Sequence, residues 1–321
     1  MNLPVEQLLE AKGHDLGLEL LTPVGPRNPS ISVSDINRPG LALAGFLENF
    51  LNERLQIFGQ TEVSYLGTLT QAQRDKSCER LLSLPVPAIV VTKGLPVPAR
   101  MRQVAREQGV PILRTAMSTT PFIHLLASYL DDIFAPTTTL HGSLVDVYGV
   151  GMLFIGKSGI GKSETALDLV ERGHRLVADD AVKVTRRYGN ILLGAGNQIL
   201  RHNMEIRGIG IIDVERIFGI RAVRETKRIE VQVNLEEWDP HKAYERLGLD
   251  DATTTMLGVS IPVVTIPIFP GKNITVISEV VALNYLVKVA GYHPARMLEE
   301  RQRAMMNNPE RQRAHVYEDP E

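Results

Sequence analysis

The chain has little cysteine, little tryptophan and few aromatic side chains. Its 321 residues include one cysteine, Cys78, and one tryptophan, and aromatic residues make up 5% of the sequence. A single cysteine excludes an internal disulfide, a thiolate metal cluster and a dithiol redox pair. We therefore expect Cys78 to be a small buried apolar side chain rather than a nucleophile.

Strong net charge and long apolar runs are also absent. The formal net charge is −2, so no global electrostatic force attracts the protein to nucleic acid or to an anionic membrane. No apolar run approaches the roughly 20 residues that span a bilayer. The first residues also lack the basic segment and following apolar segment of a secretion signal. These features predict a cytoplasmic protein that binds neither nucleic acid nor membrane.

The composition is that of a globular protein with room for two domains. Hydrophobic residues make up 44% and charged residues 22% of the chain, which is ordinary for a soluble fold. Residues 134–139 contain Pro136 and three threonines, which disfavour continuation of a helix. We place a linker there. The predicted domains are a small N-terminal α/β domain over residues 1–134 and a second domain over residues 135–321.

The first domain alternates helical and extended patterns and contains no recognisable catalytic motif. Apolar spacing of about 3.6 residues indicates helices, and short β-branched runs indicate strands. The predicted helices cover residues 5–11, 43–51, 96–107 and 119–131, and the predicted strands cover residues 30–33, 88–92 and 111–113.

The second domain contains a complete phosphate-binding loop. The apolar run 150–155 predicts a strand directly before the loop, and residues 164–172 predict a helix directly after it. Glycines in this pattern let backbone N–H groups approach a polyphosphate, the lysine contacts the outer phosphates, and the serine hydroxyl is available to Mg²⁺. The loop consists of Gly156, Lys157, Ser158, Gly159, Ile160, Gly161, Lys162 and Ser163.

A hairpin is predicted immediately before the loop. The extended runs 144–147 and 150–155 flank Tyr148-Gly149, which is typical of a tight turn. A turn centred between these two residues places His141 opposite Gly156, at the mouth of the loop. We therefore include His141 among the candidate site residues, although a histidine in this position can also be purely structural.

Two acidic residues follow the next predicted strand. Gly173 ends the loop's helix, residues 175–178 read as a strand, and Asp179-Asp180 come directly after it. An acid in this place can hold Mg²⁺ or accept the proton of an attacking hydroxyl. Because side chains alternate along a strand, one of the two should face the phosphates. The sequence does not say which, and a solvated turn is the alternative interpretation.

Two later segments also carry candidate residues. In the segment 204–214, Arg207 is suited to phosphate and Glu205 to a metal ion, while two glycines permit close backbone approach. The charged segment 244–251 has the pattern of a loop that carries Arg246 to a transferring phosphoryl group. A surface turn with an ion pair and a solvated connection are the respective alternatives.

Taken in order, these motifs resemble the bacterial HPr kinase/phosphorylase family. The resemblance spans the second domain, and the decapeptide 205–214 matches the family's signature. In the first domain the likeness is limited to size and α/β character. The matching segments are His141-Gly142, the loop ending in Gly161-Lys162-Ser163-Glu164, Val177-Ala178-Asp179-Asp180, the decapeptide Glu205 to Val214, and Glu245-Arg246-Leu247-Gly248.

The resemblance implies a bifunctional enzyme. It would phosphorylate a serine of the phosphocarrier protein HPr with ATP, or with pyrophosphate in some members, and remove the phosphate with inorganic phosphate. One carboxylate would take the serine proton in one direction and return it in the other. The implied fold is a P-loop kinase domain like that of phosphoenolpyruvate carboxykinase, assembled as a homohexamer. By residue matching, His141, Lys162, one of Asp179 and Asp180, and Arg246 are expected to be catalytic, residues 156–163 to bind the nucleotide, and Ser163 and Glu205 to ligate Mg²⁺.

One segment departs from the family pattern. Phe269 and Lys272 stand where the family has arginines, in a region associated with dephosphorylation. Lysine keeps the charge of arginine but not its planar fork, so this departure bears on the phosphorylase reaction more than on the kinase reaction. Two other functions fit the loop and the acids: a P-loop kinase for a small molecule, and a nucleotide-sensing module without turnover. Neither accounts for the decapeptide 205–214.

Overall fold

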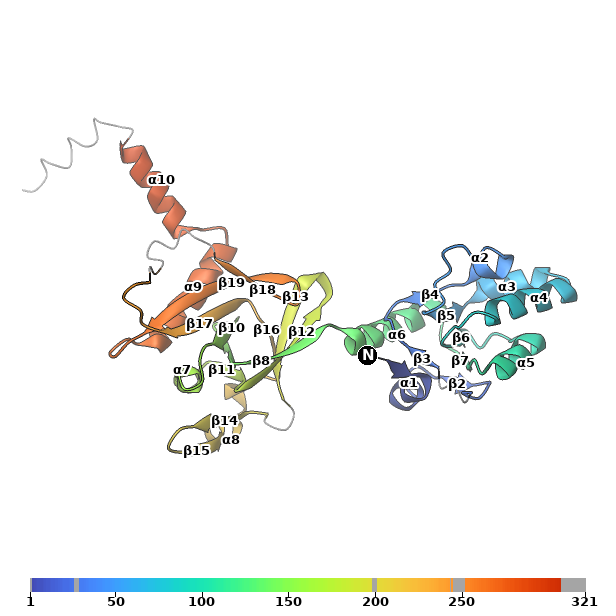
Figure 1. Ribbon diagram of the computed structural model, residues 1–321, viewed down its shortest axis with the longest axis horizontal. Coiled ribbons are helices and arrows are strands. Elements are labelled where there is room, and N and C mark those ends of the chain that lie inside the picture. Colours follow the sequence, from blue (N-terminus) through green and yellow to red (C-terminus); the bar gives the residue numbers. More distant parts are fainter. Residues whose placement is uncertain (1, 26–28, 198–200, 243, 245–251, 307–321) are drawn as a thin grey trace, which may run out of the picture. The chain divides into compact units, whose positions relative to one another are not determined.

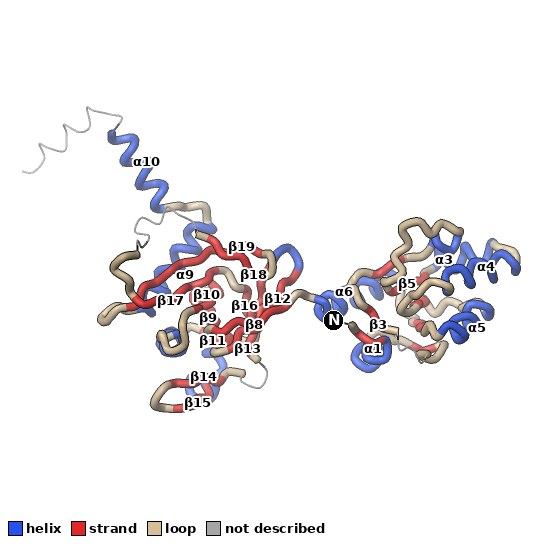
Figure 2. Tube along the Cα trace, viewed as in Figure 1, coloured by secondary structure: helices blue, strands red, loops and turns tan. Residues whose placement is uncertain are grey.

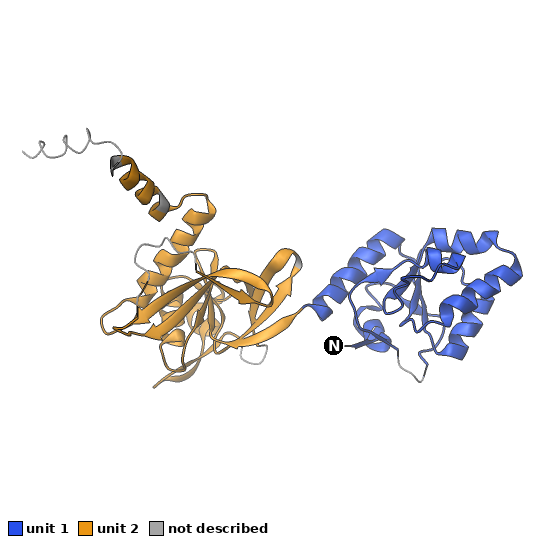
Figure 3. Ribbon diagram, turned by 45° about the horizontal axis from the view of Figure 1, so that its top comes forward, with its two compact units in different colours: residues 1–135 blue, residues 136–321 orange. Residues whose placement is uncertain are grey.

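The computed structural model describes residues 2–25, 29–197, 201–242, 244 and 252–306. The chain divides into two compact units, Met1–Ala135 and Pro136–Glu321 (Figure 3). Each unit contains both helices and strands, in agreement with the expected α/β class (Figure 1). In the part of the chain that the structure describes, no helix has the length and apolar character needed to cross a membrane.

The first unit is built on a five-stranded sheet in the order β2-β7-β6-β5-β4. Strands β4 to β7 are parallel, and β2 pairs antiparallel with β7. Its elements are β1 (Leu3–Pro4), α1 (Val5–Lys12), β2 (Glu19–Leu20), β3 (Ser30–Ile31), β4 (Ile36–Asn37), α2 (Gly40–Ala44), β5 (Leu55–Phe58), α3 (Gln60–Thr68), α4 (Gln71–Leu82), β6 (Ile89–Val91), α5 (Ala99–Gln108), β7 (Ile112–Arg114) and α6 (Thr119–Phe134).

Both faces of this sheet are covered by helices, as expected for parallel strands made of continuous apolar runs. Phe58 and Ile89 belong to the core that α2, α4 and α5 close on one face. Leu55 and Val90 belong to the core that α1 and α6 close on the other. Cys78 lies buried in the first of these cores, which confirms its expected role as a small apolar residue.

Two sequence predictions for this part of the chain were wrong, the second of them in part. The helix predicted over residues 43–51 ends at Ala44, because Gly45 adopts a left-handed conformation with φ 109° that terminates it. The linker predicted over residues 134–139 contains the division between the two units, after Ala135, but its three threonines belong to strand β8 (Thr137–His141). Three consecutive threonines favour a strand because their β-branched side chains fit an extended backbone. The three threonines that disfavour a helix therefore also indicate the strand β8.

The second unit contains two larger sheets, drawn as red strands in Figure 2. A six-stranded sheet has the order β11-β9-β10-β17-β19-β18, and a four-stranded sheet has the order β16-β13-β12-β8. The elements after β8 are β9 (Ser143–Val147), β10 (Val150–Ile155), α7 (Lys162–Glu171), β11 (Arg175–Ala178), β12 (Ala181–Arg187), β13 (Ile191–Gly196), β14 (Asn203–Ile206), β15 (Gly210–Asp213), α8 (Val214–Phe218), β16 (Thr226–Arg228), β17 (Val231–Glu237), β18 (Thr253–Met256), β19 (Val259–Ile268), α9 (Ile274–Val289) and α10 (Pro294–Met306).

The predicted hairpin is confirmed in the six-stranded sheet. Val147 pairs with Val150 and Ser143 with Phe154 across β9 and β10. Tyr148 and Gly149 both have positive φ, 52° and 85°, which is the conformation of a two-residue type I′ turn. On its other side β10 pairs in parallel with β17. The strand that delivers the phosphate loop therefore lies in the middle of the sheet.

Candidate active site

The phosphate loop connects β10 to α7. Gly159 and Gly161 adopt φ values of +77° and +102°, which L side chains rarely reach. Lys162 is 6% exposed, and its Nζ donates to the carbonyl oxygens of Gly156 and Lys157, each at 3.0 Å. Lys162 is thus the first residue of α7, and its side chain turns back so that its ammonium group contacts the start of the phosphate loop.

Most of the residues predicted from sequence line one cavity. Its volume is about 150 Å³. The cavity brings together the loop, the acidic pair and the signature decapeptide, which are far apart in the chain. Arg246 lies outside the described residues. The lining consists of His141, Ser158, Gly159, Gly161, Lys162, Ser163, Glu164, Asp179, Asp180, Glu205 and Arg207.

Asp179 is the buried member of the acidic pair. It is 7% exposed, and its Oδ1 accepts hydrogen bonds from the hydroxyls of Ser143, at 2.5 Å, and Ser163, at 3.1 Å. Its Oδ2 is buried and has no hydrogen-bond partner within the described residues. Burial raises the pKa of this carboxyl, and the two serine hydroxyls oppose that shift. One oxygen is therefore fixed and the other is free to take a proton.

Asp180 has a different environment. Its carboxylate oxygen lies 2.9 Å from Nδ1 of His141, and the two side chains are 63% and 53% exposed. Its φ of 64° is left-handed, a conformation that aspartate tolerates better than most residues. Its backbone carbonyl accepts from Gly142 N at 3.1 Å. This contact ties the turn to the chain just before β9.

The acidic pair does not lie on a strand, so the prediction that only one of the two acids faces the phosphates was wrong. β11 ends at Ala178, and both acids lie in the turn to β12 rather than on a strand. Side chains in such a turn need not alternate, so both acids line the cavity. What separates them is burial: Asp179 is enclosed by serine hydroxyls, whereas Asp180 is exposed beside an imidazole.

The predicted pairing of His141 with Gly156 was also wrong. His141 ends β8 and pairs with Ala181 of β12 in the other sheet. Gly142 passes the chain between the two sheets, where a β-carbon would lie 2.4 Å from the carbonyl oxygen of Phe154. Only glycine fits this crossing. His141 nevertheless lines the same cavity as the loop, because β8 and β12 meet beside Asp180.

The signature decapeptide forms most of a two-stranded hairpin and the start of α8. Glu205 on β14 pairs with Ile211 on β15. The turn uses Gly208, with φ 84°. Arg207 lies over the phosphate loop, since a β-carbon at Gly159 would be 2.5 Å from one of its guanidinium nitrogens. The hairpin thus delivers a cation and a carboxylate to the cavity.

Ser143 is a site residue that sequence reasoning missed. It is fully buried and is the first residue of β9, opposite Phe154, which lies near the end of β10. A polar residue at the start of a buried strand needs a hydrogen-bond partner. This need for a partner, together with the hairpin register that places Ser143 opposite Phe154, could have predicted a hydroxyl near the phosphate loop.

The cavity suits a magnesium ion held together with phosphates. Mg²⁺ usually takes one or two protein carboxylates or hydroxyls and completes its shell with phosphate and water. Ser163 and Glu205 both line the cavity, and the unpartnered oxygen of Asp179 is nearby. Among the described residues there is no cluster of three or more His, Cys, Asp or Glu side chains that would form a complete protein-only metal site.

Comparison with known proteins identifies the family of the chain. The family described as "HPr Serine kinase N terminus" matches residues 3–130, and "HPr Serine kinase C-terminal domain" matches residues 132–302. An HPr kinase/phosphorylase of Chloroherpeton thalassium is 48% identical over 307 residues, which are 94% of this chain and 90% of that protein. One of Prosthecochloris aestuarii is 50% identical over 299 residues, covering 93% and 88%.

Among solved structures, the HPr(Ser) kinase/phosphatase of Coxiella burnetii is 31% identical. The match covers 51% of this chain and 99% of that one, with a TM-score of 0.45. The two family matches together cover nearly the whole described chain, and the relatives align over most of their own length. The chain belongs to the HPr serine kinase family.

Proposed function

We propose that this protein is a bifunctional HPr kinase/phosphorylase. It transfers a phosphoryl group from ATP, or from pyrophosphate, to a serine of the phosphocarrier protein HPr, and it removes that group with inorganic phosphate. The observation that carries the proposal is the buried carboxylate of Asp179 beside the phosphate loop, with one oxygen held by two hydroxyls and the other unpartnered. The catalytic site lies in the domain of residues 135–321. The enzyme acts in the cytoplasm.

In the kinase direction, Asp179 is the general base. The serine oxygen of HPr attacks the terminal phosphorus, the bond from that phosphorus to the bridging oxygen breaks, and ADP or phosphate leaves. The serine proton passes to Oδ2 of Asp179. Burial keeps the pKa of this carboxyl above its ordinary value, which strengthens it as a base while it is ionised.

In the phosphorylase direction the same residue is the general acid. An oxygen of inorganic phosphate attacks the phosphorus of phosphoserine, a P–O–P bond forms, and the bond to the serine oxygen breaks. The protonated Asp179 returns its proton to that oxygen, and pyrophosphate leaves. One carboxyl thus serves both directions, since the acid of the reverse step is the product of the forward step.

The remaining charged residues stabilise the transferring group. Lys162 and Arg207 both line the cavity at the phosphate loop, and His141 is held by Asp180. Fixed cations around a phosphoryl group supply most of the catalysis in such reactions. We assign Arg246 to the same task. Ser163 and Glu205 would hold Mg²⁺, which neutralises charge on the polyphosphate when bound.

We further propose that the protein assembles as a homohexamer. Helix α9 carries apolar side chains on its solvent face as well as on its buried face, and a helix that is apolar all round is normally covered on both sides. The exposed apolar residues of α9 are Val276, Val280, Leu283, Leu286, Val287 and Val289. Association of subunits would cover them.

Phosphate transfer to HPr tests the proposed activity. Purified protein, Mg²⁺ and ATP labelled in the terminal phosphate are incubated with HPr or with HPr in which the target serine is alanine. We expect label on the serine-containing HPr alone. Label on a small molecule but not on HPr would indicate a small-molecule kinase, and nucleotide binding without any transfer would indicate a sensing module. Either result overturns the proposal.

A further inference from the structure

The phosphate cavity is too small for a whole nucleotide. Its volume is about 150 Å³, whereas sites for nucleotide-sized ligands usually enclose roughly 300–1,000 Å³. Pyrophosphate or the phosphate tail of ATP fits a cavity of this size. The base and ribose of ATP must therefore lie outside it.

A second cavity begins where the first one ends. It is a cavity open to solvent, with a volume of about 920 Å³, and it shares Gly161 and Glu164 with the phosphate cavity. One wall is the exposed side of α7, with Asp168 and Glu171. The opposite wall is the segment 268–275 that connects β19 to α9. A ligand whose phosphates occupy the loop can extend past Gly161 directly into this space.

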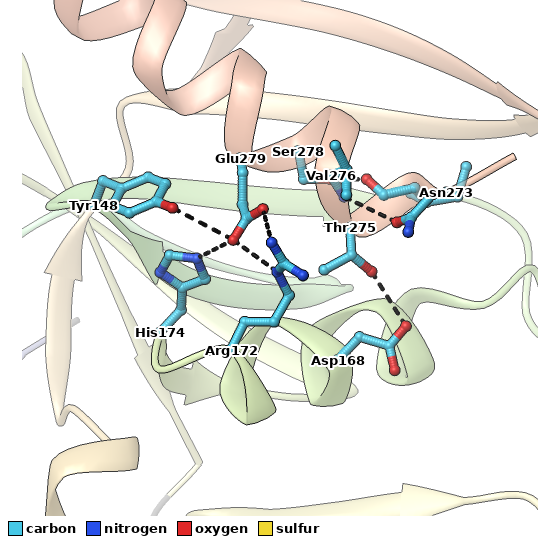
Figure 4. Close-up of polar contacts among 10 residues, drawn as sticks. Tyr148, Asp168, Arg172, His174, Asn273, Thr275, Val276, Ser278 and Glu279 are labelled. Carbon is cyan, nitrogen blue, oxygen red and sulfur yellow. Dashed lines mark hydrogen bonds and ion pairs between the residues drawn. The ribbon is translucent and has the colours of Figure 1, made fainter.

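Hydrogen bonds connect the elements that form the two walls (Figure 4). Thr275 Oγ1 donates to Asp168 Oδ2 at 3.1 Å, and Asn273 Oδ1 accepts from Val276 N at 3.0 Å, which caps α9. At the C-terminal end of α7, Arg172 donates two hydrogen bonds to Glu279 of α9, at 2.8 and 2.7 Å. A cavity bordered by such contacts is largely preformed, so little ordering cost is incurred on binding.

The chemistry of this second cavity favours an uncharged nucleoside over a second anionic group. Apolar contacts come from Ile160, Ile268 and Ile274, while Glu164 and Glu171 offer carboxylates. Isoleucine side chains pack well against the faces of a base, and carboxylates accept hydrogen bonds from ribose hydroxyls or an exocyclic amine. Three carboxylates line the cavity, and of its two cations Arg172 is already paired with Glu279. A second polyphosphate would be repelled.

We propose that the cavity between α7 and segment 268–275 binds the base and ribose of the nucleotide donor. This inference rests on the proposed function, because it gives a binding position to the base and ribose, the part of the donor that the phosphate cavity cannot hold. Lys272 lines the nucleoside cavity, with its Nζ 5.2 Å from the centre of the Phe269 ring. Pyrophosphate, which lacks a nucleoside, does not use the cavity.

The test compares the affinities for Mg-ATP and Mg-pyrophosphate in a variant that fills the nucleoside cavity. Lys272→Trp places an indole on its wall, and Glu300→Trp on α10 adds the same side chain away from it. We expect Lys272→Trp to weaken ATP binding about tenfold or more and to leave pyrophosphate affinity within about twofold. Glu300→Trp should change neither. Calorimetry on the full-length protein gives all six affinities.

Photolabelling locates the base independently of any variant. The parent protein is irradiated with 2-azido-ATP, and the labelled peptide is identified by mass spectrometry. Label in residues 268–275 or on α7 supports the inference. Label elsewhere, unchanged ATP affinity in Lys272→Trp, or an equal loss of both affinities overturns it while leaving the proposed function intact. A parent protein that binds neither ligand would contradict the proposed function itself.

Discussion

The hydroxyl of Ser143 donates to Oδ1 of Asp179 at 2.5 Å, and the other oxygen of the same carboxylate is buried without a partner in the described part of the chain. This asymmetry separates Asp179 from its neighbour Asp180. The two acids are adjacent in sequence and line the same cavity. Only the first combines burial with an unused oxygen, and that combination is what a proton acceptor requires.

We therefore expect unequal effects of amide substitution at the two acids. Asp179→Asn removes the proton acceptor and should lower kcat in both directions by roughly 10²- to 10⁴-fold, the usual contribution of a general base. Asp180→Asn retains a hydrogen-bonding partner for His141 and should cost much less. The measurement is the initial rate of each variant and of the parent at saturating ATP and HPr. Equal, mild losses would indicate that the acids only shape the turn.

Ser143 should act on the reaction through Asp179. Its hydrogen bond lowers the pKa of that carboxyl, so Ser143→Ala should raise it further. A base must be ionised to accept a proton, and the acidic limb of the kinase pH–rate profile should therefore move to higher pH. Ser143→Thr keeps the hydroxyl and serves as the matched control. A profile in Ser143→Ala that coincides with the parent's would exclude this role.

Lys162→Ala should abolish phosphorylation and phosphorolysis together. Both reactions pass the same phosphoryl group through the same loop, and loss of one fixed charge-stabilising donor typically costs about 10²- to 10³-fold. The measurement is the rate of each reaction with the same enzyme preparation. If either activity stayed near the parent's level, Lys162 would be a structural residue of the loop.

Glu279 makes a pH-dependent contribution to stability at the contact between α7 and α9. Its hydrogen bonds from Arg172, followed by that from His174, lower its pKa below the ordinary 4.5. A carboxyl whose pKa is lowered by folding stabilises the fold above its unfolded pKa, and this contribution is lost as pH falls through the folded pKa. Glu279→Gln should thus lower Tm at neutral pH, and the difference from the parent should shrink below about pH 4.

Thermal scans of both proteins between neutral and acidic pH provide the check. Asp239→Asn, at an exposed acid two residues after β17, controls for a general loss of negative charge. A Tm difference that stays constant down to acidic pH would show that the effect of Glu279→Gln is one of packing.

The exposed apolar face of α9 should be a subunit contact. Val280 and Leu283 are 57% and 47% exposed. Aspartate at both positions places charge in any interface there and should reduce the proposed hexamer to smaller species. Sedimentation velocity of the double variant, with the exposed Gln103→Asp as control, measures the change. Unaltered sedimentation of the double variant would place the contact elsewhere.

The local parts of the site could be predicted from sequence. The phosphate loop needs glycines at fixed spacing between a strand and a helix, and the tight turn at Tyr148-Gly149 sets the register of the hairpin before it. These features depend on residues close together in the chain. For the same reason the helix from Thr119 and the strand at Ile112 lie where apolar periodicity placed them.

The parts that depend on distant residues could not be predicted in the same way. His141 reaches the cavity from the four-stranded sheet, where it pairs with Ala181. The chain crosses between the two sheets at Gly142, which lies against the carbonyl of Phe154, and no pattern of neighbouring residues predicts this contact. The different burial of Asp179 and Asp180 arises from Ser143 and Ser163 on other elements. Helix α4 was missed because its sequence is strongly polar, and a single face with Cys78 and Leu81 joins it to the core.

The fate of the phosphoserine phosphorus tests most directly whether one site runs both reactions. HPr labelled with ³²P on its serine is incubated with the enzyme, Mg²⁺ and unlabelled inorganic phosphate. We expect the label to be recovered in pyrophosphate, at a rate that depends on the phosphate concentration. Asp179→Asn should lose this reaction together with kinase activity. Label released as orthophosphate at a rate independent of added phosphate, or retained by Asp179→Asn, would contradict this expectation.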